Sequence, residues 1–540
     1  MKKLTLCALI SVISLSFNPL AAQNDDFGTN KIEALLYHIN KSYVDSVDNE
    51  TMVEDAIKGI LNELDPHSSY IPADELIAMN EPLKGNFEGV GIQFNIFKDT
   101  LLVVQTISGG PSEKVGLMAG DQIMKVDGEN IAGIGLKNTD VMKLLKGPKG
   151  TVVNVSIKRG NTKKILEFEI TRDKIPIYSV DAGYMANPNT GYIKVNRFAK
   201  NTVTEFNEAL DTLREQGMKN LILDLQGNGG GYLRTAKALA DEFLKDGDLL
   251  VFTQGRSFPK DESFATSGGS YEKGKLIVLI DKSSASASEI VAGAIQDHDR
   301  GLIIGRRSFG KGLVQKPVQL PDGSAVRLTT QRYYTPAGRC IQKSYEEGVD
   351  AYRKEKYERL EKGELSSMDS IIYPDSLKFF TANNRVVYGG GGIMPDLFVP
   401  IDTTMGSEYY YAVVRKGAMN SFALDFVNKS RSSLIKEYPN VKAFRDDFKT
   451  DEKFMNKFMN YAEKEDIEKD PEEYEKGKLL TQTRLKALIA RNLYDGGAFY
   501  EIINPIFPTY KKALEIMDTN TFDQLGMKRA SKMQMVKQVK

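Results

Sequence analysis

The sequence predicts an α+β protein of several domains, in which helical regions at both ends enclose a β-rich module and an α/β core. Near both ends, apolar residues recur three and four positions apart, which is the spacing of an amphipathic helix. Short β-rich runs between glycine turns fill the region 85–172, and strand-like and helix-like runs alternate from 191 to 338. At about 150 residues per domain, the chain of 540 residues has room for three or four domains.

The first residues have the pattern of a secretory signal peptide. A basic start precedes an apolar stretch, Leu4–Phe17, that is short for a membrane-spanning helix, and the small residues Ala21 and Ala22 follow it. We expect residues 1–22 to be removed on export, with the periplasm as the protein's compartment. Leu20 is not the small residue that the cleavage pattern prefers, so the pattern places the cleavage only inexactly. An uncleaved anchor is the alternative.

Composition narrows the partners and the redox chemistry. Charged residues make up 27% of the chain and sum to a net charge of zero, and no basic stripe accompanies stacking aromatic residues, so nothing favours a nucleic-acid partner. Cys7 lies in the signal segment, which leaves Cys340 alone in the mature chain and excludes an intrachain disulfide. We expect no cofactor and no metal.

The elements follow in order along the chain. Residues 28–84 are expected to be helical, because KIEALLYHINKSYV and TMVEDAIKGILNEL both carry apolar residues three and four apart. From 85 to 172, runs such as LLVVQTI, QIMKVDG and TVVNVSIKRG lie between glycine turns, which predicts a compact β-rich module.

The region 173–400 is expected to be an α/β core. A strand (GYIKVNRF), a helix (TVTEFNEALDTLREQ) with a Thr202–Glu205 capping box, a second strand (LILDL) and a second helix (LRTAKALADEFL) follow one another. The charged stretch at about 344–366 is interpreted as a surface insertion. Residues 401–540 again have a helical pattern and end in a basic stretch.

Four serines crowd the joint between a predicted strand, KLIVLID, and a predicted helix, EIVAGAIQDHD, in the stretch SSASASE at 283–289. A serine at such a turn exposes its hydroxyl at a helix N-terminus, where free N–H groups and the helix dipole favour developing negative charge. This is where a nucleophile is expected. A serine nucleophile also needs a residue that takes its proton, and the chain holds only three histidines.

The stretch GRRSFGKGLVQ at 305–315 offers a lysine as that base. Gly305 and Gly310-Lys311 are spaced as in a nucleotide-binding loop, but Gly312 replaces the Ser or Thr that Mg²⁺ requires, and a strand follows instead of a helix. Glycine and apolar neighbours can desolvate Lys311, and desolvation lowers the pKa of a lysine. On the residues alone, an ordinary surface lysine in a glycine loop remains the alternative.

The glycine-rich turn LILDLQGNGGGY at 221–232 follows another strand that is predicted to be buried. Glycine lets the backbone approach a ligand and direct N–H groups to one point, as an oxyanion hole requires. A tight strand-to-helix turn would explain the same glycines.

Together with YYTPAG and VYGGGGIMPD further along the chain, these motifs resemble, in order and spacing, the carboxyl-terminal processing proteases, also called tail-specific proteases. Members of this family are serine peptidases with a Ser/Lys dyad, and the resemblance covers about residues 30–400. It implies that Ser286 is the nucleophile, that Lys311 is its general base and that Gln315 orients the lysine.

The same resemblance implies a peptidase core of the crotonase-like type. It also implies an oxyanion hole made by the backbone N–H groups of Ala287 and of one glycine in the turn, which is assigned to Gly230. The neighbouring Ser284 and Ser288 are interpreted as structural polar residues of the joint.

Two details of the motifs need an explanation from the fold. Gln226 stands where the family usually has arginine, which puts a local salt bridge in doubt. Lys311 and Gln315 are four residues apart, which is too far for contact in a straight strand, so a bend is expected at Gly312.

The β-rich module resembles the PDZ domain of these proteases. GVGIQF is similar to the loop whose N–H groups receive a peptide's terminal carboxylate while the peptide adds as a strand. The residues of this loop assigned to peptide binding are Gly89, Val90, Gly91 and Ile92. On the adjoining helix, Val141 and Leu145 either line the pocket for the last side chain or belong to the core.

These observations predict a secreted serine endopeptidase that captures the free, apolar C-terminus of a protein or peptide and cuts near it through an acyl-enzyme. The alternative is a non-catalytic C-terminus-binding or chaperone-like module on the same fold, against which the intact dyad argues. A homo-oligomer, an adaptor protein and loose membrane association stay open.

Overall fold

The computed structural model divides the chain into two compact units, residues 1–64 and 65–540. The described residues are 26–97, 99–107, 109–160, 164–371, 375–519 and 521–524. The expected signal segment and the basic C-terminal stretch lie outside them. In the described part of the chain, no helix combines the length and the apolar character needed to cross a bilayer.

The described part of the first unit consists of the helices α1 (Asp26–Ser42) and α2 (Asn49–Asn62), as the spacing of apolar residues predicts. The Asp48 carboxylate accepts hydrogen bonds from the N–H groups of Glu50 and Thr51, which lie in the first turn of α2 and have no acceptor within the helix. Asp48 therefore fixes where α2 begins.

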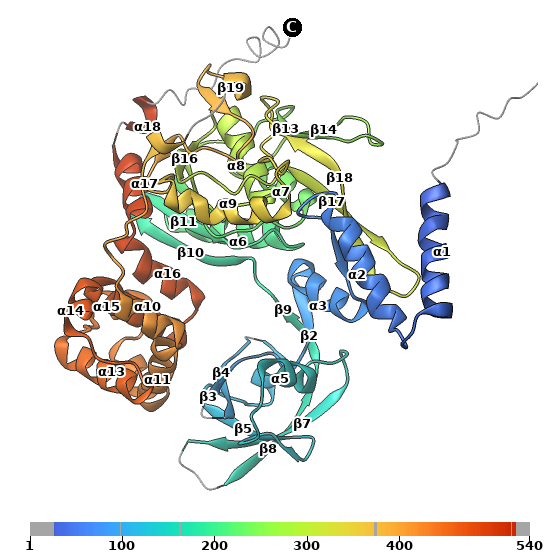
Figure 1. Cartoon of the computed structure of the whole chain (residues 1–540). Coiled ribbons are helices and arrows are strands. Elements are labelled where there is room, and N and C mark those ends of the chain that lie inside the picture. The colour runs from blue at the N-terminus through green and yellow to red at the C-terminus, as the bar shows by residue number, and fades with distance from the viewer. Residues whose placement is uncertain are drawn as a thin grey trace, which may run out of the picture. The chain divides into compact units, whose positions relative to one another are not determined.

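The second unit starts with β1 (Ser69–Ile71) and α3 (Ala73–Lys84), followed by the β-rich module. The module's sheet has the order β3-β4-β5-β7-β8, with β6 beside β5. Its elements are β3 (Ile92–Phe97), β4 (Thr100–Thr106), α4 (Pro111–Lys114), β5 (Asp121–Val126), β6 (Glu129–Asn130), α5 (Asn138–Leu145), β7 (Val152–Arg159) and β8 (Ile165–Thr171). Before and after it, β2 (Asn86–Gly89) and β9 (Asp173–Pro176) pair antiparallel, so the chain enters and leaves the module side by side (Figure 1).

The main sheet of the second unit has the order β10-β11-β12-β15-β16-β21 and is parallel except for β10. Its strands are β10 (Val180–Asn187), β11 (Thr190–Val195), β12 (Asn220–Asp224), β15 (Leu276–Ile280), β16 (Leu302–Gly305) and β21 (Leu397–Phe398). Alternate residues of a strand point to opposite faces, so β12 contributes Leu221 and Leu223 to one core and Ile222 to another. The first core is closed by α6 (Thr202–Glu215), α7 (Leu233–Asp241) and α8 (Ala287–Asp297), and the second by α17 (Pro508–Asp518) (Figure 1).

A second sheet has the order β1-β18-β13-β14, with β17 also paired to β18. Its further strands are β13 (Leu249–Gln254), β14 (Asp261–Phe264), β17 (Leu313–Gln319) and β18 (Ala325–Tyr334). The segment between this sheet and β21 contains α9 (Val349–Glu361), the short helices η1 (Met368–Ser370) and η2 (Asp375–Leu377), and the strands β19 (Lys378–Phe380) and β20 (Val386–Tyr388). The charged stretch 344–366 is only partly a surface segment, because Tyr352 and Arg359 of α9 are buried.

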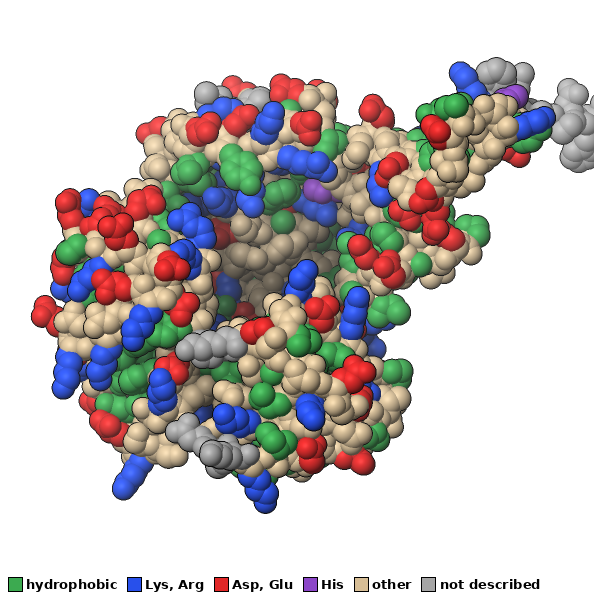
Figure 2. Space-filling model, turned by 60° about the horizontal axis from the view of Figure 1, so that its bottom comes forward, with side chains coloured by type: hydrophobic (Ala, Val, Ile, Leu, Met, Phe, Trp, Pro, Cys, Tyr) green, Lys and Arg blue, Asp and Glu red, His purple; other side chains and the backbone are tan. Residues whose placement is uncertain are grey.

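The C-terminal region is helical, as its pattern predicts. Its elements are α10 (Glu408–Arg415), α11 (Ala418–Glu437), α12 (Val441–Asp447), α13 (Glu452–Lys464), α14 (Pro471–Lys476), α15 (Lys478–Leu493), α16 (Gly496–Ile503), η3 (Asn504–Ile506), α17 and α18 (Thr521–Gln524). Helices α10 to α16 share a separate core rich in aromatic residues, among them Phe422, Phe444 and Phe458. Charges of both signs are interspersed on the face shown in Figure 2, in keeping with the zero net charge.

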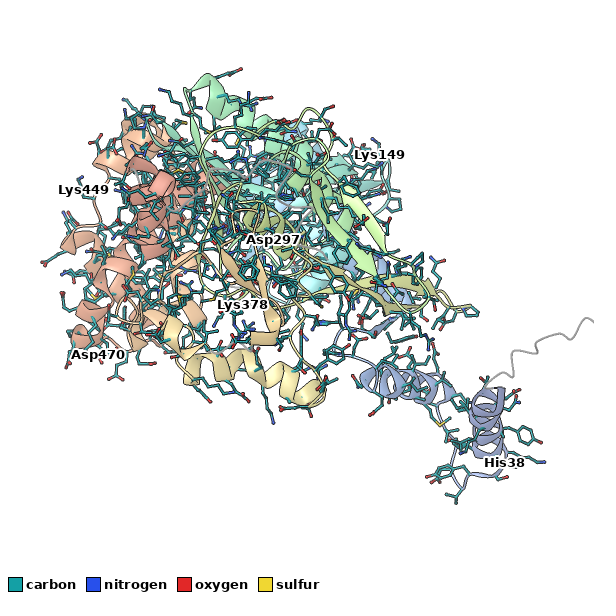
Figure 3. All side chains as sticks on the ribbon, turned by 90° about the horizontal axis from the view of Figure 1, so that it is seen from above. His38, Lys149, Asp297, Lys378, Lys449 and Asp470 are labelled. Atoms are coloured by element: carbon teal, nitrogen blue, oxygen red, sulfur yellow. The ribbon has the colours of Figure 1, made fainter. Side chains whose placement is uncertain are left out.

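A buried ion pair closes the C-terminal end of α8. Asp297 lies in the interior (Figure 3), and its Oδ1 is 2.5 Å from Nη2 of Arg339, which follows the YYTPAG motif. Neither side chain is more than 1% exposed. The negative end of a helix dipole disfavours a carboxylate, so the arginine neutralises a charge that α8 alone would not tolerate.

The predicted capping box at the start of α6 is wrong. The N-cap is Asn201, and Thr202 lies inside the helix with its hydroxyl accepting from the N–H of Ala199. The Glu205 carboxylate accepts instead from the N–H and hydroxyl of Ser179, which belongs to the chain entering β10. The tertiary contact to a neighbouring segment replaces the local one that the spacing suggests.

Candidate active site

Three loops that carry sequence motifs meet at one edge of the main sheet. The glycine turn follows β12, the serine joint follows β15 and the lysine loop follows β16, and these three strands are neighbouring and parallel. Loops at the carboxyl ends of parallel strands lie on the same side of a sheet, where open α/β sheets bind ligands. A cavity of about 440 Å³ there is lined by residues of all three loops, including Gly230, Ser286 and Lys311.

Ser286 lies at the sharp turn between β15 and α8. It is the N-cap of α8, and its φ of +55° and ψ of −110° are unusual for a residue with a side chain. Such a conformation costs about 1–3 kcal/mol and persists only where the surroundings impose it. The turn therefore presents the Ser286 side chain to the cavity at the positive end of α8.

The neighbouring serines have the structural role expected of them. The Ser284 hydroxyl donates to the carbonyl of Leu225 at 2.8 Å, and the Ser288 hydroxyl donates to the carbonyl of Asn228 at 2.9 Å. Both hydroxyls thus tie the serine joint to the glycine turn.

The buried carboxylate of Glu289 connects the serine joint to the lysine loop. It accepts from the N–H groups of Ser286 (2.8 Å), Lys311 (2.9 Å) and Gly310 (2.7 Å) and from the hydroxyl of Ser308 (2.5 Å). Burial raises the pKa of Glu289, and the hydrogen bonds oppose this rise because each donor favours the charged carboxylate. Glu289 is not among the site residues predicted from the sequence, although a Ser followed three residues later by Glu at a helix start is the capping-box signal.

Tyr333 of β18 bridges the same two residues from the carbonyl side. Its buried hydroxyl lies 3.1 Å from the carbonyl oxygen of Ser286 and 2.5 Å from that of Lys311. The Glu289 carboxylate, which accepts from both N–H groups, and the Tyr333 hydroxyl, which lies at both carbonyls, thus fix the backbones of Ser286 and Lys311 relative to each other.

The Lys311 amine is largely desolvated. Burial lowers its pKa from 10.5 to about 8, and the positive charge of Arg327, which lines the same cavity, acts in the same direction. The carboxylates of Asp65 and Glu289 oppose this shift. At a pH near 8, a substantial part of this lysine is therefore a neutral amine that can accept a proton.

Gln315 contacts the lysine, although the two are four residues apart. Lys311 Nζ donates to Gln315 Oε1 at 2.9 Å. A bend is expected at Gly312. The structure has an irregularity two residues further on, where the β17–β18 register shifts after Val314 and Thr330 of β18 is the extra, unpaired residue of a bulge. A bulge of this kind bends and twists the paired strands, which a straight-strand estimate leaves out.

The glycine turn lies directly against Ser286. A Cβ on Gly230 would meet the Ser286 Cβ at 2.9 Å, and the φ of +105° also requires glycine. The N–H of Gly230, assigned to the oxyanion hole, donates instead to Asn228 Oδ1 at 2.9 Å. Gly231 also lines the cavity. Because the Phe198 N–H donates to the Gly230 carbonyl and the Tyr232 N–H donates to the Phe198 carbonyl, the N–H of Gly231 itself points away from Phe198. No acceptor for the Gly231 N–H is found within the described residues.

The salt bridge put in doubt by Gln226 is made by another residue. Asp224 at the end of β12 pairs with Lys194 of the adjacent β11, whose Nζ lies 3.1 Å from its Oδ1 and also donates to the carbonyl of Gln226. Tyr192 of β11 donates to the other carboxylate oxygen at 2.5 Å. A lysine on the next strand therefore places a positive charge beside the Asp224 carboxylate and the carbonyl of Gln226.

A second cavity, of about 320 Å³, lies in the β-rich module. Of the residues assigned to peptide binding, those that line it are Val90, Gly91, Ile92, Val141 and Leu145. Val141 and Leu145 also belong to the module's buried core, and their contact with a peptide's last side chain stays a prediction. Gly89 does not line this cavity in the structure and pairs with Asp173 in the β2–β9 ladder. At the same cavity, Lys146 of the module forms an ion pair with Glu81 of α3.

Other reactive side chains lie outside the cavity at Ser286, whose described lining includes no histidine. His298 is buried with Nε2 at 2.7 Å from the carbonyl oxygen of Leu249, and His38 lies on α1 (Figure 3). Burial raises the pKa of the Cys340 thiol and so keeps it protonated. Among the described residues, no three His, Cys, Asp or Glu side chains form a group that could hold a metal ion.

Four segments of the chain match known families. Residues 189–351 match peptidase family S41, and residues 89–170 match the PDZ domain. Residues 15–75 match the N-terminal domain of the activating protease CtpB, and residues 409–495 match DUF8443, a family of unknown function.

The chain is also similar to individual proteins along much of its length. The carboxy-terminal-processing protease of Bartonella bacilliformis is 37% identical over 342 residues, which cover 62% of this chain and 78% of that protein. The carboxy-terminal processing protease CtpB of Bacillus subtilis is 35% identical over 346 residues, covering 63% of this chain and 71% of that protein. Among solved structures, the photosystem II D1 C-terminal processing protease is 32% identical with a TM-score of 0.32, covering 56% of this chain and 82% of that one. The resemblance inferred from the motifs is confirmed: the chain belongs to the carboxy-terminal-processing proteases of peptidase family S41, which are serine peptidases, and it carries a PDZ domain.

Proposed function

We propose that this C-terminal processing protease cuts peptide bonds with Ser286 as nucleophile and Lys311 as general base. One observation carries this assignment: the side chain of Ser286, at the positive end of α8, and a desolvated amine line the same cavity. The lowered pKa of Lys311 supports it, because a base must be unprotonated to act.

In the proposed reaction, Lys311 Nζ takes the proton of the Ser286 hydroxyl while Oγ bonds to the scissile carbonyl carbon. The carbonyl oxygen becomes an oxyanion, for which we propose the N–H groups of Ala287 and Gly231 as donors. Lys311 then gives its proton to the departing amine nitrogen, the C–N bond breaks, and the acyl group remains as an ester on Ser286. Water, deprotonated by Lys311 in turn, hydrolyses this ester and restores the serine hydroxyl.

Substrate capture is proposed to occur at the PDZ domain. Its cavity is lined mainly by apolar side chains such as Val90, Ile92 and Val141, which favour an apolar last residue. The N–H groups of the loop at 89–92 would stabilise the terminal carboxylate while the peptide adds as a strand. The preferred substrate is therefore a protein with a free, apolar C-terminus, cut near that end.

We further propose that the protein is exported and acts in the periplasm after removal of residues 1–22, as their composition suggests. Amino-terminal sequencing of the protein recovered from the periplasmic fraction tests this. A first residue upstream of position 20, or recovery in the cytoplasm alone, would contradict it.

The catalytic assignment is tested with an unstructured protein substrate that ends in a free apolar residue. The wild-type protein should cleave it, and Ser286→Ala should show no cleavage above background. Lys311→Arg should be equally inactive, because it keeps the positive charge but cannot act as a neutral base. Cleavage by the Ser286→Ala protein would refute the assignment.

A further inference from the structure

The turn of residues 65–68 determines how Gln315 faces the catalytic lysine. Gln315 Nε2 lies 2.5 Å from the backbone carbonyl oxygen of His67, and Oε1 accepts from Lys311 Nζ. An amide side chain has an NH₂ end that donates and an oxygen end that accepts, and a backbone carbonyl oxygen can only accept a hydrogen bond. The His67 carbonyl therefore requires the NH₂ end of Gln315 and leaves the oxygen end for the lysine.

The direction of this contact matters for a neutral amine. A neutral lysine nitrogen has two N–H bonds and one lone pair, and only the lone pair can take the serine proton. When one N–H of Lys311 is directed to Gln315 Oε1, the lone pair is confined to the remaining directions, which include that of Ser286 in the shared cavity. With the amide reversed, its NH₂ group would meet an amine N–H or occupy the lone pair itself.

The Asp65 carboxylate holds this turn in shape. It accepts from the N–H groups of His67 (2.8 Å) and Ser68 (2.9 Å), from the Ser68 hydroxyl (2.5 Å) and from the hydroxyl of Thr329 on β18 (3.0 Å). Ser68 Oγ also accepts from the Thr329 N–H at 3.1 Å. The turn is thus fixed to β18, the strand that pairs with the one bearing Gln315.

Helix α9 binds both the turn and the lysine loop. The Tyr352 hydroxyl lies 2.8 Å from His67 Nε2, and burial together with the charge of Lys311 lowers the pKa of His67 to about 4, so this ring is neutral at physiological pH. About two turns further along α9, the buried Arg359 donates to the carbonyls of Ser308 and Phe309, just before the lysine. A helix in the charged stretch therefore connects the two parts that must stay in register.

We propose that the turn of residues 65–68 and Tyr352 form a positioning unit, which acts through Gln315 to aim the Lys311 lone pair at Ser286. This inference rests on the proposed roles of Ser286 and Lys311 and adds residues that touch neither the substrate nor the reacting atoms. Tyr352 is the most informative member, because its hydroxyl touches neither Lys311 nor Gln315. Its partners are His67 Nε2 and, at 3.5 Å, Nε2 of Gln342, whose Oε1 accepts from the N–H of Gly312.

A double-mutant cycle between Tyr352→Phe and Gln315→Met tests the proposal, with kcat and KM measured on a peptide with a free C-terminus. In the wild-type background, Tyr352→Phe should lower kcat about five- to tenfold and leave KM within about twofold, as expected for one lost hydrogen bond that matters in the transition state. In the Gln315→Met background it should change kcat less than about twofold, because no amide remains to be held. Tyr271→Phe is the matched control, since it removes a hydroxyl that is buried and bonded to the carbonyls of Lys219 and Lys275 outside the cavity.

Equal losses in both backgrounds, a similar loss in Tyr271→Phe, or wild-type activity of Gln315→Met would overturn the proposal. If Gln315→Met is too slow for kcat to be measured, the same double-mutant cycle is measured in Ser286→Ala proteins as the pKa of Lys311. This pKa comes from the pH dependence of the reaction of Lys311 with an amine reagent, and mass spectrometry locates the modified residue. An aligned acceptor favours the ammonium form, so Tyr352→Phe must lower the pKa of Lys311 when Gln315 is present. In the Gln315→Met background, Tyr352→Phe must leave this pKa unchanged. An active Lys311→Arg protein would refute the assignment of Lys311 as base. If Lys311→Arg is inactive but the effects of Tyr352→Phe and Gln315→Met are additive, only the positioning unit is refuted.

Discussion

The pH dependence of cleavage should identify Lys311 as a base with a pKa far below that of an ordinary lysine. Burial is the largest influence on the pKa of this amine and lowers it, and the charge of Arg327 lowers it further. The carboxylates of Asp65 and Glu289 raise the pKa, but by less. The His67 ring, with a pKa of about 4, stays neutral over the range in which the lysine titrates. A single ionisation is therefore expected above pH 6.

The size of the effect follows from the pKa. With a pKa of about 8, the neutral fraction of Lys311 is about 1% at pH 6, about 50% at pH 8 and about 99% at pH 10. The value of kcat/KM should thus rise about fiftyfold from pH 6 to pH 8 and only about twofold from pH 8 to pH 10. A lysine with the ordinary pKa of 10.5 would instead give a rise of about 75-fold over that second interval.

The assay measures initial cleavage rates of one fluorogenic peptide at low concentration, in buffers of constant ionic strength. A circular dichroism spectrum at each pH shows that the fold persists. A rate that still climbs tenfold per pH unit between 8 and 10, or an inflection near the ordinary histidine pKa of about 6.5, would refute the assignment of a desolvated lysine as base.

Three further predictions concern the lysine, the glycine turn and the PDZ domain. The folded-state pKa of Lys311 lies below its unfolded value, so its ammonium form destabilises the fold below pH 8, and this cost disappears as the pH rises to 10.5. Lys311→Met should therefore raise the free energy of unfolding by up to about 3 kcal/mol at pH 7. The corresponding gain in Tm should be lost by pH 10.5. An unchanged Tm at pH 7 would contradict this. Gly230→Ala should abolish cleavage while the circular dichroism spectrum is retained, since its Cβ would meet the Ser286 Cβ at 2.9 Å; an active variant would show that the turn can move away. Amidating the C-terminus of a long substrate should lower kcat/KM at least about tenfold, because the loop N–H groups lose their carboxylate, and equal rates would exclude the loop from substrate capture.

The parts of the site that are local in sequence were predictable. The serine joint, the lysine loop and the glycine turn each follow an apolar run that forms a parallel strand, and their convergence follows from the adjacency of β12, β15 and β16. The position of Ser286 at a helix N-terminus also follows from its immediate neighbours. In each case, the deciding signal lies within about a dozen residues of the motif.

The supports of the site were not predictable in this way, because they come from segments that are distant in the chain. Lys194, on an adjacent strand, forms the ion pair with Asp224 beside Gln226. The His67 carbonyl accepts a hydrogen bond from Gln315, which is 248 positions further along the chain. Glu205 of the wrongly predicted capping box binds Ser179 because the start of β10 lies beside α6 in the fold. Spacing along the sequence carries no information about such partners.

Segments that are charged on average can still contribute to the core. The stretch 344–366 has the composition of a surface insertion, yet α9 buries Tyr352 and Arg359 against the lysine loop. The buried guanidinium has two carbonyl acceptors there and an ion pair with Glu355, so its charge is compensated. A prediction from average composition overlooks single residues of this kind.

The central claim, that Ser286 forms an acyl-enzyme with the help of Lys311, is tested most directly by mass spectrometry of the quenched reaction. Wild-type protein mixed with an ester or peptide substrate and acid-quenched within the first turnovers should gain the mass of the acyl fragment, located on the peptide that contains Ser286. The adduct should be absent from Ser286→Ala and from Lys311→Arg. An adduct on another residue, or full cleavage activity in Ser286→Ala without any adduct, would contradict the claim.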